Sequence, residues 1–315
     1  MKKVFLLAVA VAMMTACEKP VYDEFSDFSE KSENSEDAKQ TKKFTFTLKG
    51  DFSPEWKLDI SGDFPAGDAG EAAAREVTRG YLAADGRDMT DVWVLDYMNG
   101  QMVQKLHQSD NTADDFGKPV MQLAYGEHHV YFVASRGAGP DLNAGEHRLT
   151  WEKVSDTFYN DYEVNVVSTS NGNRAVTLER VVTKLRLTFT DAIPENAATI
   201  NITPAIWYKG LDYVTGEPCA TAENQMTTIN IPEASIGQTG VQASMFSIST
   251  ATEWTTDVTI SSKTSADVVL GTATLTAVPL KANRVSDYSG PLFSAGGSMS
   301  MSLNTVWDEP LLKMW

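Results

Sequence analysis

Short runs in which apolar and polar residues alternate recur along the chain from residue 43 onward. In the first run, residues 43–49, Phe44, Phe46 and Leu48 alternate with polar residues. A period of two with one apolar face is typical of a half-buried β-strand. We therefore predict that structure begins here, with a strand whose three apolar side chains enter a core.

The next strong pattern is a hairpin over residues 91–107. Two apolar segments, 92–95 and 102–106, flank Asn99 and Gly100, the pair favoured in a type I′ turn because both central residues need positive φ. The first arm is apolar on both faces, so we expect it to lie centrally between packed layers.

A long alternating run over residues 176–190 is the predicted midpoint of the architecture. It exceeds the usual strand length, and we expect a first sandwich to end and a second to begin along it. Residues 71–77 have the composition of one or two helical turns, and long helical periods are absent. Further short β runs are expected at residues 58–60, 120–125, 130–135, 147–151, 162–168, 199–203, 205–208, 226–231, 241–248, 255–261, 268–278 and 298–306.

Strands at this spacing, divided by Gly, Pro, Asn and Asp, predict an all-β fold. We expect two tandem antiparallel β-sandwich domains, residues 43–174 and 175–315. They would follow a signal peptide at residues 1–16 and a tether at residues 17–42.

The first seventeen residues resemble the lipobox signal of a bacterial lipoprotein precursor. Lys2 and Lys3 precede eleven apolar residues, and small residues then lead to Cys17. Eleven apolar residues are too few to span a bilayer. The resemblance implies cleavage between Ala16 and Cys17 and acylation of Cys17, so that lipid would hold the protein at a membrane. The alternative is an ordinary secretory signal that happens to end at a cysteine.

Residues 18–41 carry eight acidic and three basic side chains and few large apolar ones. Such a segment cannot bury enough surface to offset its ordering entropy, so we predict a disordered tether.

Overall charge and cysteine content exclude several classes. A net charge of −16 without a cluster of Lys and Arg argues against a nucleic-acid partner. If Cys17 carries lipid, Cys219 has no partner, so the protein is expected to fold without a disulfide framework.

The sequence contains no motif that identifies a catalytic or metal site. Glu127, His128 and His129 invite a metal interpretation, but neighbours on a strand point to opposite faces, so we predict no metal site. The chain has no nucleophile elbow, Walker loop, dinucleotide fingerprint or zinc-protease motif. Its carboxylates could include a glycosidase pair, but nothing selects one. We expect no enzyme and no cofactor.

Aromatic residues leave one binding alternative open. A glycan platform could use Trp207, Tyr208, Tyr213, Trp254, Trp307 and Trp315. Aromatic residues of β-sandwiches more often lie in the core.

Five segments together resemble the Bacteroidales fimbrillin family, the subunits of type V pili. They are TR at 78–79, MTDVWVLDY at 89–97, LERVVTKL at 178–185, LKANR at 280–284 and SGPLF at 289–293. The DVWVLDY form is similar to the anchor and minor-subunit branch.

This resemblance implies two transthyretin-like or immunoglobulin-like sandwiches, no catalysis, and fimbrial subunits as partners. In polymerising members an Arg-specific protease releases the first strand, and a neighbour's strand fills the groove, which is a form of β-augmentation. The matching cleavage residue here is Arg79, ahead of Arg75 and Arg87, and the displaceable strand carries Phe44, Phe46 and Leu48.

The carboxyl end favours one role within the family. Residues 308–315 are short, do not alternate and contain Pro310, so they would make a poor donor strand. We therefore expect an anchor or accessory subunit in the outer membrane and fimbrium, with a host or bacterial surface ligand possible. The alternatives are a surface glycan-binding lipoprotein and a polymerising or tip fimbrillin cut after Arg79.

Overall fold

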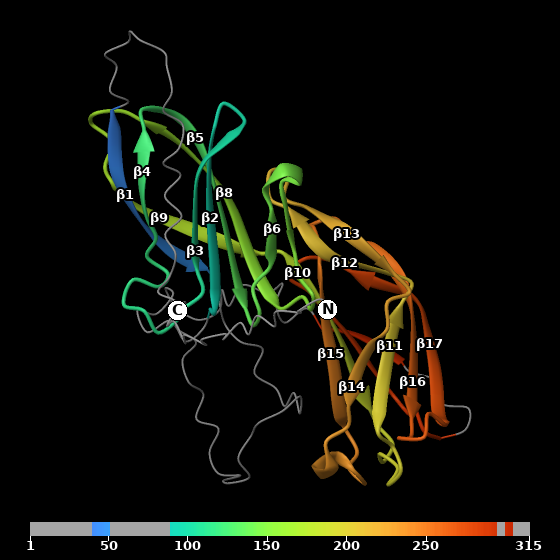
Figure 1. Ribbon diagram of the computed structural model, residues 1–315. Helices are drawn as coiled ribbons and strands as arrows, with labels where there is room; N and C mark the ends of the chain where they lie inside the picture. The colour runs from blue at the N-terminus through green and yellow to red at the C-terminus, as the bar shows by residue number, and fades with distance from the viewer. Residues whose placement is uncertain (1–39, 51–88, 295–299, 305–315) are drawn as a thin grey trace, which may run out of the picture. The chain divides into compact units, whose positions relative to one another are not determined.

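The regular secondary structure is almost entirely β-strand (Figure 1). The computed structural model describes residues 40–50, 89–294 and 300–304, which all belong to one unit spanning residues 39–315. Two 3-10 turns, η1 (Ala144–Glu146) and η2 (Glu233–Ser235), are the helical segments in these ranges. The strands are β1 (Thr41–Gly50), β2 (Asp91–Met98), β3 (Gln101–Gln108), β4 (Val120–Ala124), β5 (Gly126–Arg136), β6 (Asp141–Asn143), β7 (Arg148–Thr150), β8 (Asp156–Val166), β9 (Asn173–Arg180), β10 (Val182–Phe189), β11 (Thr199–Pro204), β12 (Ile206–Asp212), β13 (Glu217–Glu223), β14 (Thr227–Asn230), β15 (Val241–Ile248), β16 (Trp254–Lys263), β17 (Val269–Leu280), β18 (Val285–Gly290) and β19 (Ser300–Asn304).

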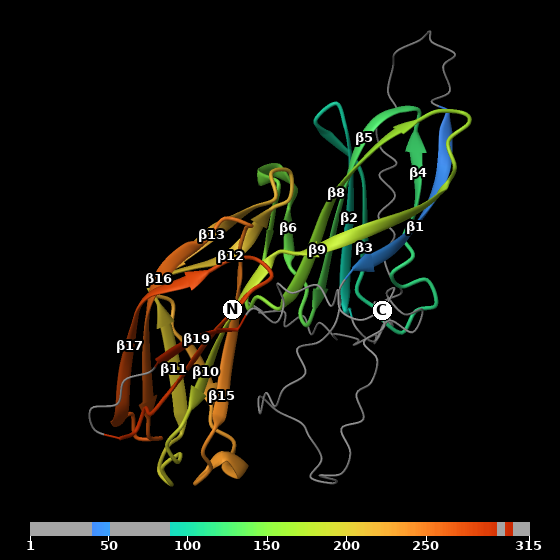
Figure 2. The same cartoon turned by 180° about the vertical axis from the view of Figure 1, so that it is seen from behind.

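The first sandwich is a single hydrogen-bonded sheet that folds over on itself. Its strand order is β3-β2-β5-β8-β9-β1-β4, but β8 and β9 pair at only Phe158 with Arg180 and Tyr159 with Glu179. That narrow link lets β9, β1 and β4 face the other four strands (Figures 1 and 2). The core between the two layers includes Phe44, Phe46, Leu48, Val94, Phe132, Phe158 and Val176.

A second pair of layers uses the strands that follow. The sheet β15-β10-β18-β19 packs on the sheet β14-β11-β16-β17. Buried residues from both sheets form their common core: Leu185, Leu187, Ile200, Ile202, Met245, Val258, Ile260 and Leu280. The structure is therefore an all-β sandwich fold, as the alternating pattern predicts.

A smaller third sheet, β13-β12-β7-β6, was not predicted. Leu149 of β7 and Leu211 of β12 are fully buried in a cluster with Leu95 of β2 and Val182 of β10. This cluster covers the face of β2 that points away from the first core. It explains why β2 is buried on both faces.

Several predicted strands are confirmed. β1 buries Phe44, Phe46 and Leu48 completely. The turn between β2 and β3 has positive φ at Asn99 (53°) and Gly100 (74°), as a type I′ turn requires. β2 has residues in the first core on one face and in the cluster of Leu149 and Leu211 on the other, so its predicted position between packed layers is also confirmed.

The alternating run over residues 176–190 contains the change from the first sandwich to the second. The run divides into β9 and β10, which belong to different sheets, and Val181 between them donates its amide to Thr157 O at 3.0 Å. The division follows from burial, because residues 182–187 of β10 are all buried although Thr183, Lys184 and Arg186 are polar. The apparent polar face of this strand is a second covered face.

Pairing and boundaries also differ from the expectation. β1 pairs with β9 and β10 pairs with β18 in parallel, so the sandwiches are not wholly antiparallel. β6, β13 and β18 were not predicted as strands. The strand expected near residues 58–60 and the helical turns at 71–77 lie outside the described residues.

Candidate functional site: the first strand and the groove it fills

β1 joins the first sandwich through two half-length pairings. Thr41 to Thr45 pair antiparallel with β4, and Thr45 to Gly50 pair parallel with β9. Two further backbone bonds extend these ladders: Thr45 N donates to Gly172 O at 2.7 Å, and Phe46 N donates to Pro119 O at 3.0 Å. β1 thus bridges two strands that do not pair with each other.

Side chains of β1 occupy the middle of the first core. The centre of the Phe46 ring lies 5.0 Å from that of Phe132 and 6.1 Å from that of Tyr162, and both pairs pack edge-to-face. The centre of the Phe44 ring lies 6.0 Å from that of Phe46. Edge-to-face packing of this kind adds to the free energy of burial. Without β1 these neighbours would line an apolar groove open to solvent.

The free energy involved is large for one strand. Burial of a Phe or Leu side chain contributes roughly 1.5–3 kcal/mol, so the three buried side chains of β1 contribute roughly 5–9 kcal/mol. Whole domains are stable by only about 5–15 kcal/mol. A sandwich that lost β1 would therefore need another strand in its place to stay folded.

The rim of the groove fits closely around β1. A Cβ atom at Gly172 would lie 2.4 Å from the backbone oxygen of Lys43, so a larger residue there would force β1 away from β9. The guanidinium of Arg174 lies over the Phe44 ring, 5.4 Å from its centre, and Lys42 Nζ donates to Ser168 O at 2.6 Å.

A buried His–Asp pair supports the strand beside β1. His128 Nε2 donates to the carbonyl of Ala124, the last residue of β4, at 2.9 Å, and His128 Nδ1 lies 2.7 Å from Asp96 Oδ1. Burial raises the pKa of the Asp96 carboxyl, and His128 lowers it in part. The pair links β4 to β2 across the core.

The predicted processing residues lie elsewhere in the chain. Ala16, Cys17, Arg75, Arg79 and Arg87 are outside the described residues, as are residues 308–315. β1 ends at Gly50 and β2 begins at Asp91, so Arg79 lies between these two strands in the sequence. The chain after Arg79 therefore contains every described strand except β1.

Two of the segments that carry the family resemblance meet in the structure. Arg180 donates to both carboxylate oxygens of Asp156 at 2.7 and 3.2 Å and to Asn283 Oδ1 at 3.0 Å, and its guanidinium lies 4.7 Å from the centre of the Phe158 ring. Asn283 in turn donates its amide to Val182 O at 2.9 Å. LERVVTKL and LKANR are thus parts of one buried polar junction.

A third such segment, residues 289–293, is held by Asp191, which sequence reasoning missed. The Asp191 carboxylate accepts from the amides of Leu292, Phe293 and Ser294 at 2.7–3.0 Å. Burial alone would raise the pKa of Asp191, but these backbone donors outweigh it and lower that pKa. An Asp beside its own strand end gives no sequence signal for partners a hundred residues away.

The other residues singled out in the sequence are the aromatic residues of the glycan alternative and Cys219. Trp207 and Tyr213 are 4% and 0% exposed, so the core interpretation of these aromatic residues is confirmed and they form no open glycan platform. Trp307 and Trp315 lie outside the described residues. Cys219 is half-buried with a free thiol whose pKa is raised by burial.

No helix within the described ranges has the length and hydropathy to span a membrane.

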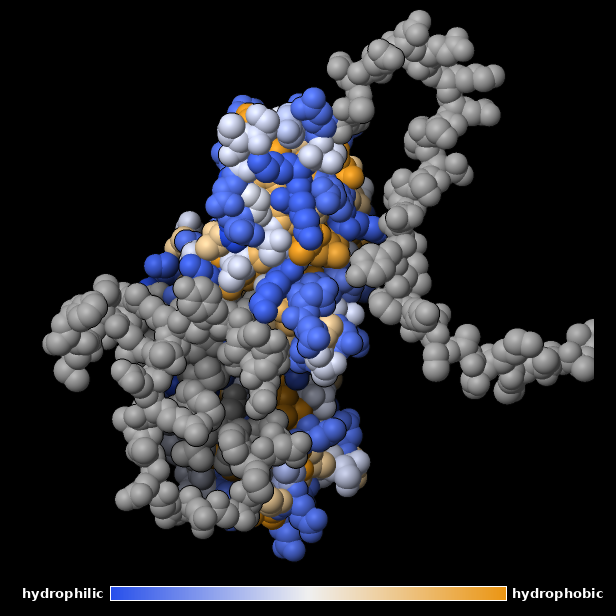
Figure 3. All heavy atoms as spheres, turned by 90° about the vertical axis from the view of Figure 1, so that its left-hand side faces the viewer, coloured by the Kyte–Doolittle hydropathy of each residue, from blue (hydrophilic) through white to orange (hydrophobic). Residues whose placement is uncertain are grey.

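The described part of the face that contains β1 and β4 is largely hydrophilic, with apolar side chains in small separate groups (Figure 3). Phe44, Phe46 and Leu48, the apolar side chains of β1, are fully buried in the first core.

Comparison with known proteins gives structural likenesses alone. No family model and no curated relative matches the chain. Solved structures that resemble it include a candidate adhesin from Bacteroides ovatus, with 11% identity, a TM-score of 0.47 and coverage of 84% of this chain and 94% of that one. The tip fimbrial protein Mfa3 from Porphyromonas gingivalis, with a C-terminal truncation, has 14% identity, a TM-score of 0.40 and coverage of 70% and 96%.

A fimbrial assembly protein from Parabacteroides distasonis also resembles the chain, with 8% identity, a TM-score of 0.46 and coverage of 86% of this chain and 98% of that one.

Proposed function

We propose that the protein is a non-enzymatic, lipid-anchored subunit of a bacterial surface fimbria, of the anchor or accessory kind, which joins other subunits by β-strand complementation. The observation that carries the proposal is β1. The first described strand supplies three fully buried side chains and precedes Arg79 in the sequence. This is the arrangement that strand exchange needs, since main-chain pairing gives strength and alternate side chains give register.

The anchor role rests on the order of features along the chain. Cys17 precedes β1, and β1 precedes Arg79. A cut after Arg79 would sever every later strand from the lipid. A subunit that stays on the outer membrane therefore keeps β1 in its groove, and fimbrial partners would join it at other surfaces.

Crosslinking on the native cell surface tests this function. We expect mild crosslinking followed by affinity purification to recover fimbrial subunits with this protein. Recovery of no surface protein would contradict the proposal.

Replacement of the anchor cysteine, Cys17→Ala, tests the lipid. We expect the variant to leave the membrane fraction because acyl chains are the proposed attachment. The matched control is Cys219→Ala, whose thiol lies in the folded body; it should stay with the membrane. Equal retention of both variants would rule out the lipid anchor.

A polymerising or tip subunit cut after Arg79 is the second candidate, favoured by the position of Arg79 between β1 and β2. It predicts a shortened chain that starts at Gly80 and has lost its lipid. The glycan-binding alternative has no support from Trp207 or Tyr213, since both are buried.

A further inference from the structure

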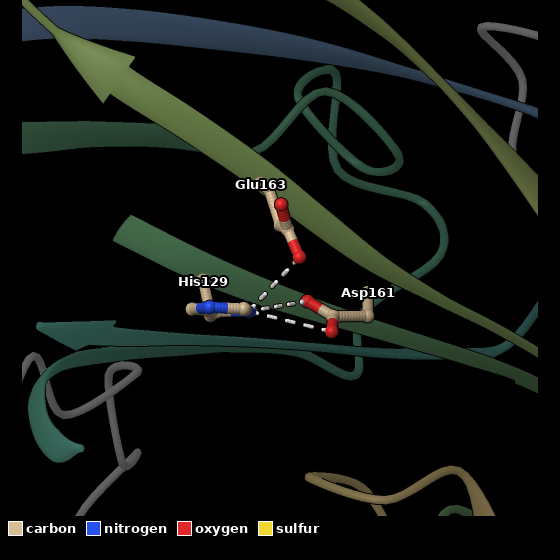
Figure 4. Close-up of side chains that lie close together, drawn as sticks. All are labelled: His129, Asp161 and Glu163. Atoms are coloured by element: carbon tan, nitrogen blue, oxygen red, sulfur yellow. Dashed lines mark hydrogen bonds and ion pairs between the residues drawn. The ribbon is translucent and has the colours of Figure 1, made fainter. Parts of the chain in front are cut away.

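His129 lies with two carboxylates on the face of β5 and β8 opposite His128 (Figure 4). In the pairing of these antiparallel strands, His129 is opposite Glu163, and Tyr131 is opposite Asp161. Glu163 and Asp161 are two residues apart on β8, so they point to the same face as His129. All three side chains are exposed, and their donor atoms lie within 4.8 Å of one another.

The spacing of these donor atoms fits the coordination of a small cation. His129 Nδ1 lies 3.1 Å from Asp161 Oδ1 and 4.0 Å from Glu163 Oε1. Two ligand atoms that are each about 2.1 Å from a zinc ion lie about 3.4 Å apart at a tetrahedral angle. These two distances lie on either side of this value, so small side-chain adjustments would bring each carboxylate and His129 to the separation that one ion requires.

The charges at this place also favour a cation. Among the described residues, neither Asp161 nor Glu163 forms an ion pair with a Lys or Arg; each has only His129. Two carboxylates this close repel each other, and a bound cation would relieve the repulsion. The local potential is therefore negative.

The ring of His129 is supported by the neighbouring ring of Tyr131. It stacks on Tyr131, two residues along β5, with ring centres 6.1 Å apart and planes 21° apart. Tyr131 is itself 4% exposed and packed in the cluster that contains Tyr97 and Tyr213. A rigid support of this kind limits the entropy lost when the imidazole binds an ion.

We propose that His129, Asp161 and Glu163 bind one divalent transition-metal ion, with Zn²⁺ the best fit. One imidazole and two carboxylates suit Zn²⁺ and its neighbours, whereas Ca²⁺ and Mg²⁺ prefer oxygen ligands alone. Three protein ligands leave at least one coordination position open to solvent. A carboxylate or imidazole of a bound partner can occupy that position.

Calorimetric titration of the full-length protein, purified in detergent without a histidine tag, tests the site with ZnCl₂ as the probe. We expect one equivalent of zinc to bind to the wild type. His129→Ala and Asp161→Asn should each weaken zinc affinity by at least about tenfold, because loss of a residue that only hydrogen-bonds a metal ligand already lowers metal affinity by about that factor. The matched control is Glu127→Gln, which removes an exposed carboxylate from the same face of β5 outside the cluster. Its affinity should equal that of the wild type.

A spectroscopic readout identifies the histidine. With ¹³C-labelled histidine, we expect zinc to shift the ring signal assigned through His129→Ala and to leave those of His107 and His147 in place. Absence of binding by the wild type, binding unchanged in both variants, or a shift confined to another histidine would each overturn the proposal. All three side chains are exposed, so the variants should fold, and matching thermal unfolding curves would verify it.

Discussion

Asp191 shows how one carboxylate can fix a distant segment. It accepts three consecutive amides from residues 292–294, which would otherwise be left unpaired beside the buried side chain of Leu292. Charge-assisted bonds of this kind are stronger than neutral ones. The residue therefore contributes stability only while it is ionised.

The pH dependence follows from the direction of the pKa shift. The folded-state pKa of Asp191 is below the ordinary value of 3.8, so its stabilisation is complete above about pH 4 and is lost as pH falls through the lower folded-state value. We expect Asp191→Asn to be less stable than the wild type at pH 7, and the difference to shrink below pH 4. Urea unfolding at pH 7 and at pH 3 measures both.

The control for that experiment is Asp267→Asn, which removes a carboxylate that is 82% exposed and pairs with Lys263. Its effect should be small at either pH. A constant loss of stability for Asp191→Asn from pH 7 to pH 3 would mean that ionisation of Asp191 is not what holds residues 292–294.

Arg180 is a second residue whose side chain connects segments that are far apart in the sequence. We expect Arg180→Ala to lower the free energy of unfolding by about 3 kcal/mol, because it leaves the buried Asp156 with Arg136 as its one remaining Arg partner among the described residues. Arg148→Ala, which removes an exposed pair with Glu146, should change it by at most about 1 kcal/mol. Equal effects of the two variants in urea unfolding would contradict the structural role of Arg180.

At the scale of elements, alternation was a reliable guide where one face of a strand is buried. Phe44, Phe46 and Leu48 could be assigned to a core from their spacing alone. Their partners could not, because β1 pairs with residues 120–124 and 173–178, and nothing local encodes a contact over such separations. The pattern misled at β10, whose polar residues are covered on both faces, and β13 was missed because its residues show no apolar period.

The core role of β1 gives a prediction for the element. We expect Phe46→Ala to lower the free energy of unfolding by about 3–5 kcal/mol, since it removes a fully buried ring from the centre of the first core. Thr47→Ala, the neighbour on the opposite face of β1, should cost about 1 kcal/mol or less. Guanidinium unfolding measures both, and an effect of Phe46→Ala no larger than that of Thr47→Ala would show that β1 is dispensable.

For the molecule as a whole, the sequence predicted the class of fold and left its assembly open. The all-β sandwich follows from many short alternating runs. The third sheet joins short strands from the first half of the chain, β6 and β7, to β12 and β13 from the second half, a combination that no single stretch specifies. The His129 cluster escaped prediction for the same reason, because its carboxylates come from β8 and face His129 only through strand pairing.

The proposed role depends on a chain that keeps both its lipid and β1. An anchor subunit that lost residues up to Arg79 would lose Cys17 and the three side chains that fill the first core. The two fates give mature proteins of different mass and different first residue.

Intact mass and terminal sequence of the protein from native outer membranes test this claim most directly. We predict a mature chain that begins at an acylated Cys17 and contains β1. A chain that begins at Gly80 and carries no acyl group would contradict the anchor role.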